Sequence, residues 1–112
     1  MNIKDFVGIA QNSNLDISRF CKIKNYLTVQ EKIDFIQKYY KILGDMFTED
    51  QYRGAENLVA FVIFNLMVVQ AYTDIEVDLS FESMDLLQKH RMINKIVSKI
   101  GEDYQTLLGL IQ

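Results

Sequence analysis

The chain has no proline and no tryptophan, and among its 112 residues there are one cysteine, one histidine and five glycines. The lack of proline and the scarcity of glycine argue against a turn-rich β-sandwich and against a disordered tail. The single cysteine, Cys21, cannot form a disulfide within the chain, which excludes a small secreted scaffold held by disulfides. With one His and one Cys, a zinc site with the usual nitrogen and sulfur ligands cannot be built in one chain.

Sequence motifs that carry catalytic chemistry are missing as well. Neither of the glycine-rich motifs of phosphate-binding loops occurs in the sequence. No motif places a nucleophile or a carboxylate beside His90, which we interpret as a surface or helix-end residue. The sequence therefore predicts a protein that is not an enzyme, with no catalytic residue, no metal site and no cofactor.

Long hydrophobic runs are also missing. The most apolar segment, residues 58–69, is shorter than the roughly 20 apolar residues that span a membrane. Residues 1–14 contain Asp5 and lack the apolar run of a signal peptide. We therefore expect a soluble intracellular protein that is neither secreted nor bound to a membrane. Because 49% of the residues are hydrophobic, residues 1–112 are expected to form a single domain around one core.

The charges are segregated along the chain, although the net charge is only −3. Residues 45–86 carry nine acids and a single base, Arg53, whereas residues 1–44 have a charge of +3 and residues 87–112 a charge of +2. A strongly acidic segment repels phosphates, so nucleic acid is not expected as its partner. Two interpretations stay open: the acids meet the flanking Lys-rich helices within the fold or across a subunit contact, or they form an exposed acidic surface.

Apolar spacing and capping residues predict an all-α fold. Thr28 and Glu31 form a capping box, and the helix that they open is expected to end at Gly44. Its expected apolar stripe consists of Ile33, Ile36, Tyr40 and Leu43, widened by Phe35, Tyr39 and Ile42. Thr48 with Gln51 repeats the capping signal ahead of a long central helix.

This central helix is expected from about residue 49 to residue 72 and is apolar nearly all round beyond Leu58, which is typical of a helix covered on several sides. Its Val and Ile content would also suit a buried strand, but its length and capping favour a helix. Further helices are expected over residues 2–11 with a break at 12–14, over 84–100 with a break around His90 and a stop at Gly101, and over 104–111. The prediction is a compact bundle of four to six helices with a long buried central helix.

The stretch YTDIEVDLSFES, residues 72–83, places oxygen-bearing side chains at every second position. Counted from Asp74, this spacing matches the ligand positions of a calcium-binding EF-hand loop. However, Leu79 stands where the loop needs glycine, and Asp85 stands where it needs a bidentate glutamate. The alternation with apolar residues is instead typical of a half-buried extended segment. The sequence therefore predicts no calcium site here.

We expect residues 75–79 to form a short extended connector between two helices. Tyr72 should end the central helix, and Ser80 should cap the next one. The connector should point Ile75, Val77 and Leu79 inward and leave an acidic edge in solvent or facing a partner. The residues predicted to bind a partner protein are Tyr72, Asp74, Glu76, Asp78 and Glu82.

Three segments in order carry a resemblance to a known group of proteins. They are KNYLTVQEKIDFIQKYY, a long apolar helix that ends in AYTDIEVD, and MDLLQKHRMINKIVSKIGEDY, which together span roughly residues 24–105. In this order they resemble small accessory proteins encoded among the structural genes of bacteriophages. The resemblance implies an all-helical protein that binds other phage proteins in head or tail assembly or as a virion component, and it implies no catalytic residue.

Two functions from different classes follow from these observations. The first is a non-enzymatic interaction module in virion or tail assembly, with phage structural proteins or a second copy of the chain as the partner. The second is a small inhibitor of a host defence or regulatory protein, whose acidic surface mimics a nucleic-acid backbone. Both place the protein in the host cytoplasm or in the virion, and an enzyme is the third and least supported alternative.

Overall fold

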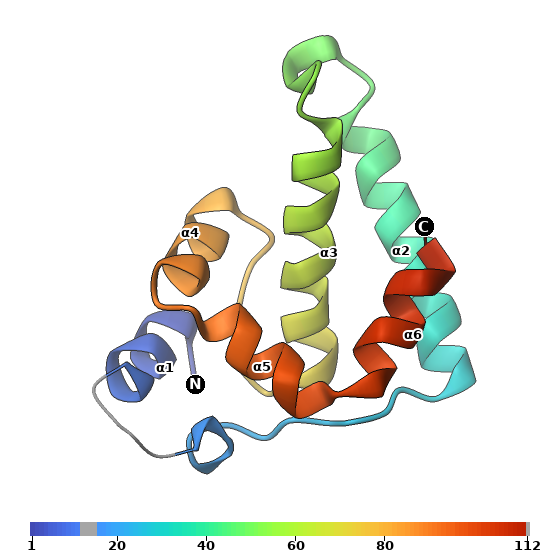
Figure 1. Ribbon diagram of the computed structural model, residues 1–112. Helices are drawn as coiled ribbons and strands as arrows, with labels where there is room; N and C mark the ends of the chain where they lie inside the picture. Colours follow the sequence, from blue (N-terminus) through green and yellow to red (C-terminus); the bar gives the residue numbers. More distant parts are fainter. Residues whose placement is uncertain (12–15, 112) are drawn as a thin grey trace.

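The structure is a computed structural model that describes residues 1–11 and 16–111, with a long buried helix lying among five others (Figure 1). The α-helices of these residues are α1 (Ile3–Ala10), α2 (Val29–Met46), α3 (Glu56–Tyr72), α4 (Phe81–Lys89), α5 (Met92–Ile100) and α6 (Glu102–Ile111). Two one-turn 3-10 helices accompany them, η1 (Ile17–Arg19) and η2 (Asp50–Tyr52). The all-α prediction is confirmed, and the expected break at residues 12–14 lies outside the described residues.

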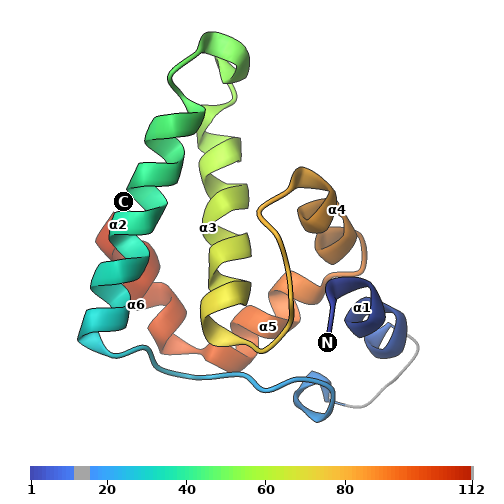
Figure 2. The same ribbon diagram turned by 180° about the vertical axis from the view of Figure 1, so that it is seen from behind.

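Helix α3 occupies the centre of the molecule. It packs against α2 on one side and against α4 and α5 on the other, and both views of the ribbon show it between these helices (Figures 1 and 2). Nine of its residues are buried, and they lie on all sides of the helix. The prediction of a long buried central helix is therefore confirmed. No helix among the described residues is long and apolar enough to cross a membrane.

The predicted start of the central helix is wrong, because α3 begins at Glu56 and not near residue 49. The Thr48 hydroxyl donates to the Asp45 carbonyl oxygen over 2.9 Å, so it satisfies the end of α2 instead of capping a new helix. Gly54 then turns the chain with a φ of 85°, a left-handed conformation that glycine adopts without strain. A capping pattern such as Thr48 with Gln51 is therefore not sufficient to predict the start of a helix where a glycine turn follows it.

The capping box of α2 forms as predicted. The Thr28 hydroxyl accepts from the Glu31 amide over 3.1 Å, and the Glu31 carboxylate accepts from the Thr28 amide over 2.9 Å. The helix continues two residues beyond Gly44 to Met46, so the predicted stop at this glycine is wrong. A glycine with ordinary helical angles can be followed by further helical residues, since it weakens a helix without ending it.

The buried face of α2 lies within the predicted stripe but does not include all of it. Phe35 and Tyr39 are buried and meet Phe64 of α3 edge-on, with ring centroids 5.6 and 5.9 Å apart. Two residues of the predicted stripe, Ile33 and Tyr40, are instead 41% and 52% exposed. Apolar residues cover more than half of the helix circumference, and the position of α3 decides which of them become buried.

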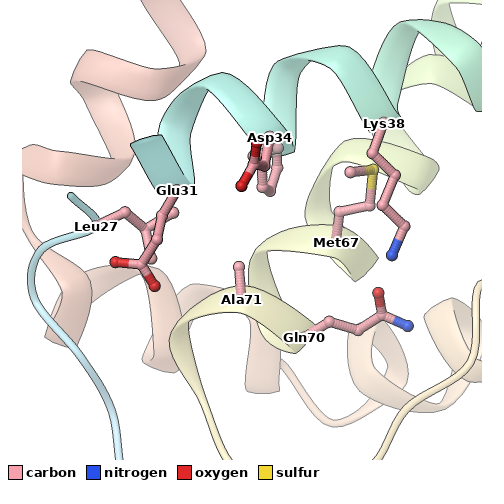
Figure 3. Close-up of a pocket in the computed structure, with 8 residues that line it drawn as sticks. Leu27, Glu31, Asp34, Lys38, Met67, Gln70 and Ala71 are labelled. Carbon is pink, nitrogen blue, oxygen red and sulfur yellow. The ribbon is translucent and has the colours of Figure 1, made fainter. Parts of the chain in front are cut away.

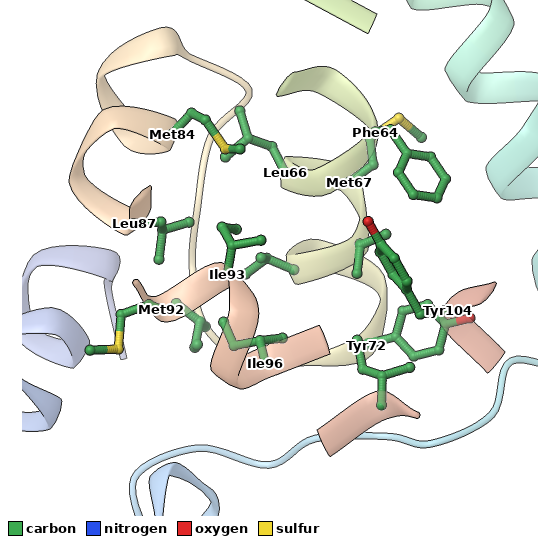
Figure 4. Close-up of a cluster of buried hydrophobic side chains, with 14 of the residues drawn as sticks. Phe64, Leu66, Met67, Tyr72, Met84, Leu87, Met92, Ile93, Ile96 and Tyr104 are labelled. Atoms are coloured by element: carbon green, nitrogen blue, oxygen red, sulfur yellow. The ribbon is translucent and has the colours of Figure 1, made fainter. Parts of the chain in front are cut away.

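The last three helices fold back along α3 through two tight turns. Helix α4 ends at Lys89, and Arg91 takes a left-handed φ of 58° before α5 begins, which confirms the predicted break around His90. Gly101, with a φ of 76°, separates α5 from α6. Figure 4 shows the core that results, in which side chains of α4, α5 and α6 converge on α3. The labelled members are Phe64, Leu66, Met67, Tyr72, Met84, Leu87, Met92, Ile93, Ile96 and Tyr104.

The connector between α3 and α4 is extended, as predicted. Tyr72 ends α3, and the Ser80 hydroxyl accepts from the Ser83 amide at the start of α4. The connector also binds two other segments through its main chain. Its start pairs in antiparallel fashion with residues 22–24, and Glu76 pairs in parallel with residues 1–3. The connector thus joins three parts of the chain that are far apart in sequence.

One polar side chain, Asn65, lies in the middle of the buried surface of α3. Its amide donates to the Phe61 carbonyl oxygen over 2.9 Å, and its carbonyl oxygen accepts from the Tyr104 hydroxyl over 2.8 Å. Asn65 is 1% exposed, so water cannot replace a lost partner without opening the core. The hydrogen bond between Tyr104 and Asn65 therefore holds α6 in position against α3.

We expect Tyr104→Phe to lower the free energy of unfolding by about 1 to 3 kcal/mol, because it leaves the buried Asn65 oxygen without a donor. The double variant Asn65→Leu/Tyr104→Phe removes both polar groups and is expected to stay within about 1 kcal/mol of the wild type. Urea denaturation of the single and double variants measures both values. A double variant that is less stable than Tyr104→Phe would contradict this explanation.

Candidate protein-binding site

The five residues predicted to bind a partner do not form one surface. Tyr72 is completely buried, and its hydroxyl donates to the Asp103 carboxylate. Its assignment to a partner-facing edge is therefore wrong, because the last turn of α3 is covered by α6. Burial, followed by the hydrogen bond to Asp103, raises the pKa of Tyr72 above its ordinary range. Its hydroxyl is a structural donor at every physiological pH.

The four acidic residues of this set are exposed, but two of them serve the fold. The Asp74 carboxylate accepts from the Lys22 amide over 2.9 Å. The Asp78 carboxylate accepts from the hydroxyls of Ser80 and Ser83, and these hydrogen bonds lower its pKa. Among the described residues, the carboxylates of Glu76 and Glu82 have no hydrogen bond or ion pair, so these two stay candidates for contact with a partner.

The acidic middle of the chain is not neutralised within the described part of the fold. All nine acidic residues of the segment 45–86 are exposed. Among the described residues, the ion pair between Asp50 and Arg53, with a nitrogen–oxygen distance of 3.4 Å, is the single one that this segment makes. The interpretation that the flanking Lys-rich helices compensate these acids within the fold is therefore wrong. Apart from Asp74 and Asp78, whose carboxylates accept hydrogen bonds within the fold, the remaining acids are available to a partner.

An apolar groove of about 460 Å³ lies between the first half of α3 and α4. We call it the α3–α4 groove, and its lining residues are Tyr52, Ala55, Leu58, Val59, Phe61, Val62, Phe81, Met84, Asp85 and Gln88. Three of its large apolar side chains face solvent: Leu58 is 64% exposed, Phe61 is 46% exposed and Phe81 is 39% exposed. Exposed side chains of this size that gather in one groove are typical of a protein-binding surface.

Both walls of the groove are helical, which makes its geometry rigid. Side chains spaced three or four residues apart on α3 face those with the same spacing on α4, as expected for two helix faces. Three rings close the end of the groove near the α2–α3 turn: Phe47 meets Tyr52 edge-on at 6.4 Å, and Tyr52 meets Phe81 at 5.9 Å. These edge-to-face contacts hold the start of α4 against the turn.

The electrostatic character of the groove is negative. Asp85 is the single charged residue that lines it. Glu82 lies one turn earlier on α4. Asp50 of η2, which supplies Tyr52 to the groove wall, is paired with Arg53 and adds no net charge. A partner with apolar side chains and a positive charge would therefore be complementary to the groove.

Sequence reasoning missed this groove, because α3 is apolar on all sides and its pattern does not indicate which face stays uncovered. A usable signal was present in the position of Leu58 and Phe61. Both lie in the first two turns of α3. The segment just before α3 is acidic, and it holds no helix long enough to cover these two side chains. Only the placement of α4, which the connector determines, shows that one face of these turns remains open.

A second hollow, of about 300 Å³, lies between the start of α2 and the end of α3 (Figure 3). Its lining residues are Leu27, Glu31, Asp34, Phe35, Lys38, Met67, Gln70 and Ala71. Most of its polar groups already have partners, since Glu31 caps α2, Asp34 accepts from Gln30 and Gln70 donates to the Val77 carbonyl oxygen. It offers no nucleophile with an adjacent base, so it does not support a catalytic function.

Cys21 and the acidic groups show no arrangement for metal or thiol chemistry. Within residues 1–11 and 16–111, no three His, Cys, Asp or Glu side chains converge in a way that could hold a metal ion. Burial, with a contribution from the charge of Asp74, raises the pKa of Cys21 to about 11. The thiol is therefore protonated at neutral pH, and Cys21 packs as a small buried residue.

Comparison of the chain with protein-family models, with curated proteins and with solved structures finds no match. The resemblance of residues 24–105 to bacteriophage accessory proteins consequently stays a prediction. The candidate site is the α3–α4 groove together with the acids beside it.

Proposed function

We propose that this protein is a non-enzymatic interaction module that binds a partner protein through the α3–α4 groove. The observation that carries the proposal is the exposure of Leu58, Phe61 and Phe81 in one helix-walled groove. Burying these side chains against a partner would yield roughly 25 cal/mol for each square ångström of apolar surface removed from water. Because the walls are rigid, little of this free energy is lost to ordering the groove.

The specific version of the proposal is an accessory role in bacteriophage head or tail assembly, in the host cytoplasm or in the virion. It rests on the resemblance of three segments to small proteins encoded among phage structural genes. An assembly factor needs a protein-binding surface and no catalytic centre, and the groove supplies such a surface. The partner would then be a phage structural protein or a second copy of the chain.

The test compares Leu58→Asp with the wild type, both tagged and purified from the native source. Leu58 lies in the first turn of α3, where an acidic residue is compatible with the helix dipole, so the variant is expected to fold. The wild type should recover capsid or tail proteins, and Leu58→Asp should lose them by at least about tenfold, equivalent to about 1.4 kcal/mol. Ile9→Asp, at an apolar position on α1 that is 44% exposed, is the control and should keep them.

A second candidate function is inhibition of a nucleic-acid-binding host protein by the acidic segment. The observation that favours it is that eight of the nine exposed acids of residues 45–86 lack an ion pair within the described residues. An acidic mimic binds mainly by charge, so raising the salt from about 50 to 500 mM should release its partner. Recovery of a nuclease or polymerase, with loss at high salt and no effect of Leu58→Asp, would contradict the assembly proposal and support inhibition.

A further inference from the structure

We propose that the occupant of the α3–α4 groove is an amphipathic α-helix of a partner protein, with Lys or Arg beside its apolar anchor residues. This inference rests on the proposed function, because it names the chemistry of the partner that the groove binds. Three features carry it: the spacing of the residues in the two walls, the state of their main-chain groups, and the sign of the charge around the groove.

The two walls of the groove present side chains with the same helical spacing. In each wall the lining residues stand at positions i, i+3, i+4 and i+7, and they are Ala55, Leu58, Val59 and Val62 on the α3 side and Phe81, Met84, Asp85 and Gln88 on α4. Seven residues of a helix extend over about 10 Å, or two turns. Anchors at i, i+3 or i+4, and i+7 of an incoming helix have the same reach, so they can enter between the two walls.

The main chain of the walls favours a helix over an extended segment. Beyond the first turns of α3 and α4, the main-chain groups are used in hydrogen bonds within each helix, and the free amides of the first turns point along the helix axes. An extended peptide in the groove would therefore bury its own main-chain groups without partners, at about 1 to 3 kcal/mol for each group. A helical peptide satisfies these groups internally and contacts the apolar walls with side chains alone.

The charge on the two walls favours a basic helix. Helices α3 and α4 together carry three acids, Glu56, Glu82 and Asp85, and one base, Lys89. The three acids are exposed, and none of them forms an ion pair among the described residues. Exposed ion pairs with a partner would add little affinity, but they would determine which sign of charge the groove accepts.

The bases of the molecule do not neutralise these acids. Lys89 is the last residue of α4 and does not line the groove, and Arg53 is paired with Asp50. Figure 1 shows that α2, with its lysines, lies on the other side of α3 from α4. The same view places α1 and α5 toward the opposite end of α3 from the α2–α3 turn. The surface around the groove is therefore complementary to Lys and Arg and repels an acidic helix.

The test selects peptides of about 16 residues, or some four helical turns, from a display library of random sequences. Selection is on the wild type, and peptides that also bind Leu58→Asp are removed. The enriched sequences are expected to repeat apolar residues at helical spacing and to contain Lys and Arg in excess. A synthetic peptide of the enriched sequence should become helical on binding, as measured by circular dichroism, and Ile9→Asp should bind it as the wild type does.

Reversing one charge of the groove measures the electrostatic part of the inference. Asp85→Lys should weaken binding of the basic peptide by at least about tenfold, because a like charge then faces its Lys or Arg. The same peptide with its Lys and Arg exchanged for Glu should bind Asp85→Lys better than it binds the wild type. The control is Gln105→Lys/Thr106→Lys, which makes the same change in net charge at two exposed positions of α6 and should leave binding unchanged.

Four results would overturn the inference. They are a library without any peptide that depends on Leu58, enriched peptides that are proline-rich or lack helical spacing, enriched peptides without an excess of Lys and Arg, and equal binding of the basic peptide to Asp85→Lys and the wild type. Self-association of the wild type in sedimentation, abolished by Leu58→Asp, would assign the groove to a second copy and would also overturn it.

The proposed function can fail or stand separately from this inference. If Leu58→Asp keeps every partner that the wild type recovers from the native source, the groove is not the binding site and the proposed function fails too. If Leu58→Asp loses a partner whose contact segment is acidic or not helical, the interaction module stands and the basic helix does not.

Discussion

Asp103→Ala is expected to lower the free energy of unfolding by about 3 to 5 kcal/mol at pH 7. The reason is that the Asp103 side chain is 8% exposed and forms an ion pair of 2.9 Å with Lys32, whose side chain is 12% exposed. Removing the carboxylate leaves the Lys32 charge without its partner in a site that water barely reaches. Breaking a buried ion pair in this way is costly even where the intact pair contributes little.

The Asp103 carboxylate also joins two further parts of the fold to α6. It accepts from the Leu27 amide over 3.0 Å and from the Tyr72 hydroxyl. These donors belong to the segment before α2 and to the end of α3, whereas Asp103 lies in the first turn of α6. The variant is therefore expected to loosen α6 and the start of α2 together, and hydrogen exchange should locate the loss of protection in these two segments.

The same group should make stability depend on pH in the acid range. Burial alone would raise the pKa of Asp103, but hydrogen bonds from Tyr72, Lys32 and Leu27 outweigh it and hold the pKa below its ordinary value. A carboxylate with a lowered pKa contributes stability that is fully present above its unfolded pKa of about 4 and is lost as the pH falls toward its folded pKa. Urea denaturation of Asp103→Asn and the wild type should therefore give curves that begin to converge as the pH falls below about 5 and meet once the pH is below the lowered pKa of Asp103. Parallel curves, with the difference kept at low pH, would contradict this assignment.

Leu66→Ala is expected to lower the free energy of unfolding by about 3 to 5 kcal/mol, since Leu66 is 0% exposed and its side chain lies among α3, α4 and α5 in the core. Figure 4 shows it opposite Met84 and above Ile93, so truncation leaves a cavity that these helices cannot close independently. The loss combines the transfer free energy of the removed atoms with the cost of the cavity.

Leu58→Ala is the matched control for this prediction, because it makes the same truncation two turns earlier on α3. With 64% of Leu58 exposed, the expected change in stability is within about 0.5 kcal/mol. Thermal denaturation of both variants, together with binding of the peptide enriched on the groove, separates the two roles of α3. Leu66→Ala should change stability without changing the groove, and Leu58→Ala should weaken peptide binding without changing stability. A Leu58→Ala variant as unstable as Leu66→Ala would show that the groove is closed in solution.

Features that depend on neighbouring residues could be predicted from the sequence. The capping box of Thr28 and Glu31 and the cap at Ser80 are formed by side chains that contact amides three residues away, so the sequence alone specifies them. The break around His90 and the end of α3 at Tyr72 could also be predicted, because the local apolar pattern changes at both places. Alternation of apolar residues likewise indicated the extended connector, which the main-chain pairing of Glu76 supports.

Features decided by packing could not be predicted in this way. The burial of Phe35 and Tyr39 instead of Ile33 and Tyr40 depends on where α3 lies. The hydroxyl of the buried Tyr72 donates to Asp103, which is 31 residues away along the chain, so no local pattern indicates this contact.

The candidate site likewise has one feature that the sequence indicates and others that only packing decides. The sequence indicated which charges are in excess, and the nine acids of residues 45–86 are indeed exposed. It did not indicate that Asp74 and Asp78 serve the fold or that an apolar groove opens beside α4. A groove is formed between two helices, and this one depends on where α4 packs against the first half of α3.

The pairing of the connector with the first residues has a consequence for the order in which the chain folds during synthesis. Helix α1 is translated before the other five described helices, yet the Ile3 amide donates to the Glu76 carbonyl oxygen and the Glu76 amide donates to the Met1 carbonyl oxygen. Its apolar face, with Phe6 and Val7, therefore waits for α4 and the connector until most of the chain has been translated. Closing so long a loop slows the final step of folding, and chaperones have their longest access to the N-terminal helix.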